Sequence, residues 1–208
     1  MSLKLRLASM WTPEGTLASM LDRVERTTLA ALDALVGKHA PGMAAGLKGP
    51  SGWNGAGVRT GGGLGQRRTA MASAQNARVK ALVEALGRDR AVEAGREALF
   101  PVGKRLGAEA RDELGVGDGP DDLERAARIL YRALGIDFTL ERGADGSMAL
   151  RVHRCALAGH YSTEACEILS AADEGVVAGL NPRYSMRFEQ RMTAGPAECL
   201  ACIREERK

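Results

Sequence analysis

The sequence predicts an α+β protein, in which an N-terminal helical segment precedes a domain with a small antiparallel sheet packed by helices. Apolar residues recur at helical spacing over much of residues 14–134, and the period changes to two from Ile136 onwards. An Asp145-Gly146 turn signal then separates two alternating stretches. Aromatic residues make up only 4% of the chain, so Ala, Leu, Val and Met must build the core.

Amphipathic helices are expected over most of the chain before the sheet. The first covers residues 14–38 and ends before Pro41-Gly42. Two more are expected over residues 66–88 and 90–114, and Pro101 should kink or split the second of these. A further helix opens at Pro120, where the acidic residues that follow suit a helix N-terminus, and it stops at Gly135.

The sheet is expected to form from two hairpins with a helix between them. Residues 136–143 and 147–154 alternate apolar and polar positions around the turn signal. Residues 161–180 return to helical spacing, residues 184–188 alternate again, and residues 199–205 form a short last strand. This order of elements is typical of an α+β domain with one antiparallel sheet.

The chain divides into an N-terminal helix with a Gly-rich extension, residues 1–65, and a cysteine-containing α+β domain, residues 66–208. Residues 42–65 are too rich in glycine for a helix interior. They fit no nucleotide-binding fingerprint, because no Lys-Ser or Lys-Thr pair follows the glycines and no strand pattern precedes them. A linker or lid is expected, with Trp53 as its anchor on the domain or on a partner. Residues 1–65 are therefore a candidate surface for a protein partner or a homo-oligomer.

Composition argues against several classes of partner. The formal net charge is only +3, from 29 basic and 26 acidic residues, and aromatic stacking platforms are scarce, so nucleic-acid binding is not expected. No stretch approaches the ~20 apolar residues of a membrane span. The N-terminus lacks the apolar core of a signal peptide, so a cytoplasmic location is expected.

The cysteines carry the strongest chemical signal. All four lie after residue 154, at Cys155, Cys166, Cys199 and Cys202, and the last two form a C-x-x-C pair. Four thiolates can close a zinc site or hold one iron–sulfur cluster, and in a reducing compartment clustered cysteines favour metal over disulfides. The spacing matches neither a zinc ribbon nor a ferredoxin. We favour a 4Fe-4S cluster over zinc, because two isolated cysteines and one pair suit a cluster wedged between helix and sheet. Four buried free thiols are the simpler alternative.

A regular strand would separate the C-x-x-C pair. Cys199 and Cys202 are separated by an odd number of positions, so their side chains would point to opposite faces of a strand. If both bind one centre, the segment must begin as a turn, which Gly195-Pro196 would allow.

Polar residues near the cysteines are candidate catalytic groups. Asp173 follows Cys166 by seven positions and therefore shares its helix face. His160 lies between the first two cysteines. Either Asp173 or His160 could move protons beside a metal. The competing interpretation places Asp173 on a solvated face, and His153 is expected to be an exposed strand residue.

The chain after residue 65 resembles the family named for L-2-amino-thiazoline-4-carboxylic acid hydrolase. The resemblance rests on Arg154-Cys155 after a strand, on Cys166 and Asp173 in the next helix, and on Gly195-x-x-x-Cys199 entering the final strand. It implies a hydrolase or carbon–sulfur bond-acting enzyme with a small sulfur- or nitrogen-containing substrate. Cys202 and residues 1–65 depart from the family pattern, and a fourth thiolate would close a metal site to substrate.

The same Gly-x-x-x-Cys ending is also similar to vinyl-reductase-type sensor domains, which bind small ligands and hold zinc with cysteines. A second hypothesis is therefore a non-catalytic protein, either a cluster- or zinc-bearing accessory subunit or a small-ligand sensor. Three ligating cysteines with an open position would favour catalysis, whereas four closed ligands would favour structure, sensing or electron transfer.

Overall fold

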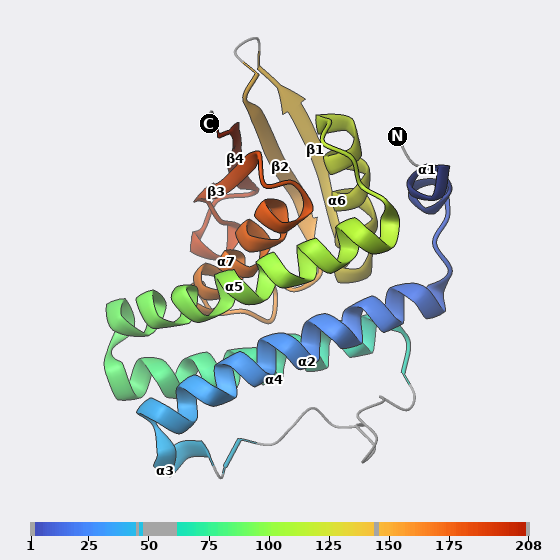
Figure 1. The fold of residues 1–208 in the computed structure, drawn as a ribbon. Coiled ribbons are helices and arrows are strands. Elements are labelled where there is room, and N and C mark those ends of the chain that lie inside the picture. Colours follow the sequence, from blue (N-terminus) through green and yellow to red (C-terminus); the bar gives the residue numbers. More distant parts are fainter. Residues whose placement is uncertain (1–2, 45, 48–61, 144–145, 207–208) are drawn as a thin grey trace.

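A computed structural model describes residues 3–44, 46–47, 62–143 and 146–206. It confirms the α+β class, with helices packed on a four-stranded antiparallel sheet (Figure 1). Most of the Gly-rich segment, including Trp53, lies outside the described residues, as does Asp145 of the expected turn. The predicted linker or lid, its anchor and its partner therefore remain predictions.

The expected helices form with nearly the expected bounds. Pro101 does not split its helix, which runs through it without interruption. A short N-terminal helix, α1, was not predicted; its Leu5 is fully buried against the main core. The helices before the sheet are α1 (Leu3–Met10), α2 (Glu14–His39), α3 (Pro41–Ala44), α4 (Leu64–Leu86), α5 (Arg88–Leu114) and α6 (Pro120–Leu134).

The sheet has the strand order β1-β2-β4-β3, with every neighbouring pair antiparallel. Its strands are β1 (Ile136–Arg142), β2 (Met148–Cys155), β3 (Tyr184–Gln190) and β4 (Cys199–Glu205). Helix α7 (Thr163–Leu180) connects β2 to β3, and a 3-10 turn, η1 (Met192–Ala194), precedes β4. Both predicted hairpins form, but the last strand lies inside the sheet, between β2 and β3.

The helices form layers on one side of the sheet. Figure 1 shows α6 and α7 against the sheet, α5 crossing next to α7, and α2 lying alongside α4 in the outermost layer. Leu32 and Val36 of α2 share a core with Val79 and Leu82 of α4 and with Ile168 of α7. Helix α2 is thus packed into the structure formed by the residues after position 65. Within the described part of the chain, no helix combines the length and apolar character needed to cross a bilayer.

Helices α5 and α7 approach closely enough for their backbones to touch. A Cβ atom added at Gly103 or Gly107 of α5 would overlap the carbonyl oxygens of Ala172 or Val176 in α7. The reverse holds for Gly175 of α7, where a Cβ atom would overlap the carbonyl oxygen of Phe100. Glycine is needed at these positions because no side chain fits between the two helices.

We expect Gly103→Ala to destabilise the fold by about 3 kcal/mol, since the added methyl group must push α5 away from the backbone of α7. The matched control is Gly37→Ala in α2, where a Cβ atom would meet nothing within 4 Å. That variant should gain about 0.5–1 kcal/mol from helix propensity. Urea unfolding measures both, and equal effects of the two substitutions would contradict the prediction.

Candidate functional site

A cavity of about 90 Å³ lies between α7, the start of β4 and the helices α2 and α4. Three of the four cysteines line it: Cys155 at the end of β2, Cys166 in the first turn of α7, and Cys199 at the start of β4. Asp173, further along α7, lines the same cavity. The structure therefore brings together three of the predicted metal ligands and one of the predicted catalytic residues.

The start of α7 is fixed by local hydrogen bonds. The Ser162 side chain caps the helix by accepting a hydrogen bond from the Ala165 backbone N–H at 3.1 Å. The Asn76 side chain of α4 accepts from the Ser162 backbone N–H at 2.8 Å. With the helix start held in this way, helical spacing directs Cys166 and Asp173 to the same cavity.

Cys202 is not brought to this cavity. The segment is a regular strand from Cys199 onwards, with Cys199 opposite Val152 and Cys202 opposite Ala149 in the β2–β4 pairing. Cys199 is buried, whereas Cys202 is half-buried and its Sγ accepts a hydrogen bond from Arg204 Nε at 3.4 Å. The turn that would aim both sulfurs at one ion does not form, because the turn at η1 ends before the strand begins.

The two histidines that flank Cys155 also lie elsewhere. His160 is exposed, with its Nε2 atom 3.2 Å from the Thr69 hydroxyl, and it does not line the cavity. His153 is exposed on β2, as its alternation predicted, and its Nδ1 atom lies 2.6 Å from Glu198. Of the candidate proton-transfer groups, only Asp173 reaches the cavity.

Burial raises the pKa of each cavity thiol, so all three are neutral near pH 7. The pKa of Cys155 rises to about 11, although the backbone N–H groups of Leu157 and Ala158 oppose the shift. Burial also raises the pKa of Cys166 and Cys199. The Met192 backbone N–H donates to the Cys199 sulfur at 3.4 Å, which partly offsets that rise. Such donors would stabilise thiolates once a cation was bound.

Burial also raises the pKa of Asp173, to about 7, and the neighbouring Glu174 adds to the rise while Arg191 opposes it. Among the described residues, no group hydrogen-bonds the Asp173 carboxyl or forms an ion pair with it. The side chain keeps some accessible surface although protein surrounds it, because it faces internal space. A carboxyl group of this kind is close to half-protonated at neutral pH and is free to exchange its proton with a bound molecule.

A hydrogen-bonded chain closes the cavity on the side of the outer helices. The Tyr161 hydroxyl donates to the Gln75 side chain, and the Gln75 amide donates to the Thr28 hydroxyl at 2.7 Å. Tyr161 and Tyr131 both line the cavity, and burial raises the pKa of each phenol. Because Thr28 belongs to α2, this hydrogen-bonded chain ties α2 to the site.

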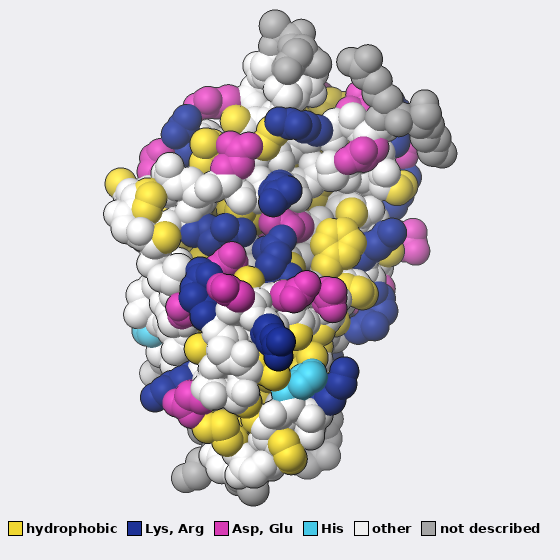
Figure 2. All heavy atoms as spheres, turned by 90° about the vertical axis from the view of Figure 1, so that its left-hand side faces the viewer, with side chains coloured by type: hydrophobic (Ala, Val, Ile, Leu, Met, Phe, Trp, Pro, Cys, Tyr) yellow, Lys and Arg dark blue, Asp and Glu magenta, His cyan; other side chains and the backbone are white. Residues whose placement is uncertain are grey.

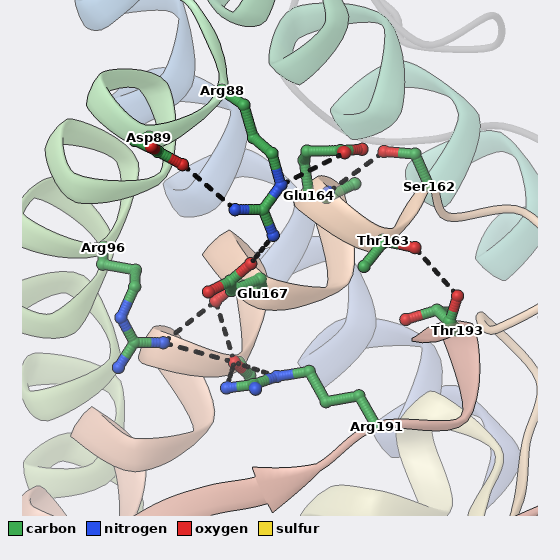
Figure 3. Close-up of polar contacts among 11 residues, drawn as sticks. Arg88, Asp89, Arg96, Ser162, Thr163, Glu164, Glu167, Arg191 and Thr193 are labelled. Carbon is green, nitrogen blue, oxygen red and sulfur yellow. Dashed lines mark hydrogen bonds and ion pairs between the residues drawn. The ribbon is translucent and has the colours of Figure 1, made fainter. Parts of the chain in front are cut away.

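Arg191 brings a charged group to the cavity, and ion pairs between α5 and α7 lie nearby. Arg191 donates to the Ser170 hydroxyl from Nε at 3.1 Å and from a terminal nitrogen at 2.9 Å, and both residues line the cavity (Figure 3). Arg96 of α5 binds Glu174 at 2.7 Å, and Arg88 binds Glu167 at 2.9 Å. Figure 2 shows this part of the surface, the left-hand side of Figure 1, with basic and acidic side chains intermixed.

A family model described as L-2-amino-thiazoline-4-carboxylic acid hydrolase matches residues 67–203. This chain belongs to that family. The matched region contains the three cavity cysteines and Asp173, and it begins within α4, so α1, α2 and α3 lie outside it. No protein matches in the comparison with curated sequences.

Solved structures share the fold of this member of the hydrolase family. A trafficking protein particle complex subunit 3 from Naegleria fowleri, covalently bound to palmitic acid, has a TM-score of 0.54 at 12% identity, covering 68% of this chain and 98% of that one. An H-NOX protein from S. oneidensis in the Fe(II)NO ligation state has a TM-score of 0.51 at 10% identity, and the match covers 87% of this chain and 98% of the H-NOX chain. At these identities the likeness concerns the fold alone.

Several residues that line the cavity could not be identified as site residues from the sequence. Tyr131 comes from α6, Thr28 from α2 and Arg191 from the residue between β3 and η1, and none belongs to a motif. Ser170 lies three residues before Asp173 in α7, but its contact with Arg191 depends on the loop between β3 and β4. Only the packing of the elements reveals these contributions.

Replacing Asp173 with Asn should change how stability depends on pH. Because the pKa of Asp173 is raised by folding, its protonation stabilises the native state at low pH, and that contribution is lost as pH rises towards 7. The Asp173→Asn variant lacks this loss. The free energy of unfolding of the variant minus that of the native chain should therefore increase with pH between pH 4 and 7, by at most about 1.4 kcal/mol per pH unit. Urea titrations at several pH values measure the difference. A constant difference across this range would contradict the assigned pKa.

Proposed function

We propose that this chain hydrolyses a small sulfur- or nitrogen-containing molecule bound in the cysteine-lined cavity, with Asp173 as the proton-transfer group. Family membership supports hydrolysis, and the cavity has room for a small molecule. The observation that carries the proposal is the buried Asp173 carboxyl, which has no hydrogen-bond partner among the described residues and has a pKa of about 7. General acid–base catalysis works best when the catalytic pKa lies near the working pH.

One carboxyl group can perform both proton transfers of such a reaction. In its ionised form, Asp173 accepts a proton from a water molecule that attacks the carbon of a C–N or C–S bond. The protonated carboxyl then gives that proton to the departing nitrogen or sulfur as the bond breaks, which regenerates the carboxylate. One water molecule is consumed, and no oxidant or reductant is needed.

The cavity thiols are less suited to act as nucleophiles. A thiol attacks as thiolate, and burial raises the pKa of Cys155, Cys166 and Cys199, so little thiolate exists near pH 7. In the absence of a bound cation, these side chains shape the cavity and offer weak hydrogen bonds to the substrate. Asp173 is therefore the better candidate for the chemical step.

A metal centre remains a second proposal, favoured by the convergence of three cysteines on one cavity. Cys155, Cys166 and Cys199 would hold it, and Asp173 lies beside them. Three thiols suit a zinc ion with one position left open, or a 4Fe-4S cluster with one iron left open, and backbone N–H groups already face two of the sulfurs. In the described part of the chain, however, no His, Cys, Asp or Glu side chains are arranged to hold an ion, so binding would require these side chains to turn.

Without Cys202, a centre of this kind would keep one position open. An open position suits substrate binding, whereas a closed set of four cysteines suits an accessory subunit or a sensor. The placement of Cys202 on β4, away from the cavity, therefore favours the enzymatic proposal over the non-catalytic one.

Activity should depend on Asp173 far more than on other carboxylates. With L-2-amino-thiazoline-4-carboxylic acid as the test substrate, Asp173→Asn should lower kcat at least about 100-fold, because it removes the proton-transfer group. The matched control is Asp112→Asn, at an exposed position of α5, which should leave kcat unchanged. For the native chain, kcat/KM should fall about tenfold per pH unit below pH 7, since the ionised carboxyl is required.

Three further results would argue against this assignment. Turnover by Asp173→Asn at the native rate would remove Asp173 from the mechanism. Loss of turnover in His160→Asn, with Asp173 intact, would transfer the proton-transfer role to the histidine outside the cavity. Tight binding of the molecule without any turnover would favour the small-ligand sensor instead.

Metal analysis of anaerobically purified protein tests the second proposal. A 4Fe-4S cluster predicts a brown protein with visible absorption, and zinc predicts a colourless one with one zinc ion per chain. Cys155→Ser, Cys166→Ser and Cys199→Ser should each lower the metal content, while Cys202→Ser should not. A fall in metal content with Cys202→Ser would restore the four-cysteine site.

A further inference from the structure

A second cavity, of about 80 Å³, lies on the other side of Asp173, between α2, α5, α6 and α7. We propose that this second cavity is a binding chamber for an uncharged apolar group, and that the substrate carries such a group into it while its reacting bond lies beside Asp173. The inference rests on the proposed function for the role of Asp173, but the chamber itself can be tested by binding alone.

The two cavities are neighbours that share one wall. Val24 and Thr28 of α2, Tyr131 of α6 and Asp173 of α7 line both of them. Asp173 thus stands between the two spaces, which explains why its side chain is surrounded by protein and yet keeps accessible surface. A molecule that spans both cavities would pass directly beside this carboxyl group.

The chemistry of the chamber selects its ligand. Most of its other lining residues are apolar, among them Leu106, Ala110, Leu130 and Val176. The polar lining residues are Thr28, Tyr131 and Asp173 of the shared wall and the Arg23–Glu113 ion pair, so a charged group placed against the apolar residues would lose its hydration without a partner. The volume has room for roughly five methylene-sized groups, judged against the space that one water molecule needs. A short alkyl chain or a similar apolar substituent fits this description.

A partly exposed ion pair belongs to the lining of the chamber. Arg23 of α2 binds Glu113 of α5 at 2.7 Å and lies 3.6 Å from Glu109 of the same helix. Both Arg23 and Glu113 line the chamber. Their side chains are about half exposed, so breaking the pair costs little and a ligand can enter the chamber here. Arg23 lies before the region that the family model matches, so this part of the chamber is built by α2, outside that region.

Binding of a series of straight-chain alcohols, from 1-butanol to 1-octanol, tests the chamber by isothermal titration calorimetry. Affinity should rise about fourfold with each added methylene until the apolar space is filled. Ala110→Leu, which fills much of the chamber from α5, should lower the affinity for 1-octanol at least tenfold. Ala133→Leu fills it from α6 and should act in the same way.

The matched control is Ala108→Leu, on the exposed side of α5, which should bind the series as the native chain does. Circular dichroism shows whether each variant is folded. One folded variant, Ala110→Leu or Ala133→Leu, is enough to test the chamber. The proposal is overturned if affinity does not rise with chain length, or if a folded chamber variant binds 1-octanol as tightly as the native chain. If the proposed hydrolysis is wrong but the chamber is real, the protein will show no turnover and will still bind the alcohols with the expected dependence on chain length.

Discussion

The close contact between α5 and α7 is the constraint on which the site depends. Glycines at Gly103, Gly107 and Gly175 let the two backbones meet, and larger side chains would separate them. Helix α7 carries Cys166 and Asp173, so this contact sets where both side chains lie relative to the sheet and to the outer helices. A displacement of α7 along α5 would move the carboxyl group away from the wall shared by the two cavities.

The burial of Asp173 is the energetic consequence of this arrangement. A carboxyl group held in apolar surroundings without hydrogen bonds favours its neutral form, which raises its pKa towards neutrality. The same burial keeps the three nearby thiols protonated. One physical cause therefore brings the pKa of the carboxyl near neutrality and keeps the cysteines protonated, unless a cation binds and reverses the preference of the thiols.

Local patterns explain why most elements could be predicted. Helical spacing, the change of period at Ile136 and the final strand from Cys199 are all properties of neighbouring residues, and each element formed close to its expected position. Strand parity also anticipated that a regular strand would separate Cys199 from Cys202. The continuity of α5 through Pro101 was missed, because tertiary packing can outweigh the unfavourable effect of one proline.

Short-range spacing in the sequence predicts the α+β class, the family, and the placement of Cys166 and Asp173 on one helix face. Which groups meet depends on how the elements pack. The tertiary structure placed β4 between β2 and β3, turned Cys202 and His160 away from the cavity, and brought Arg191 and Tyr131 to its wall. It also packed α2 against the matched region, so that two cavities flank Asp173. These relations depend on contacts between residues far apart in the chain, which no local pattern encodes.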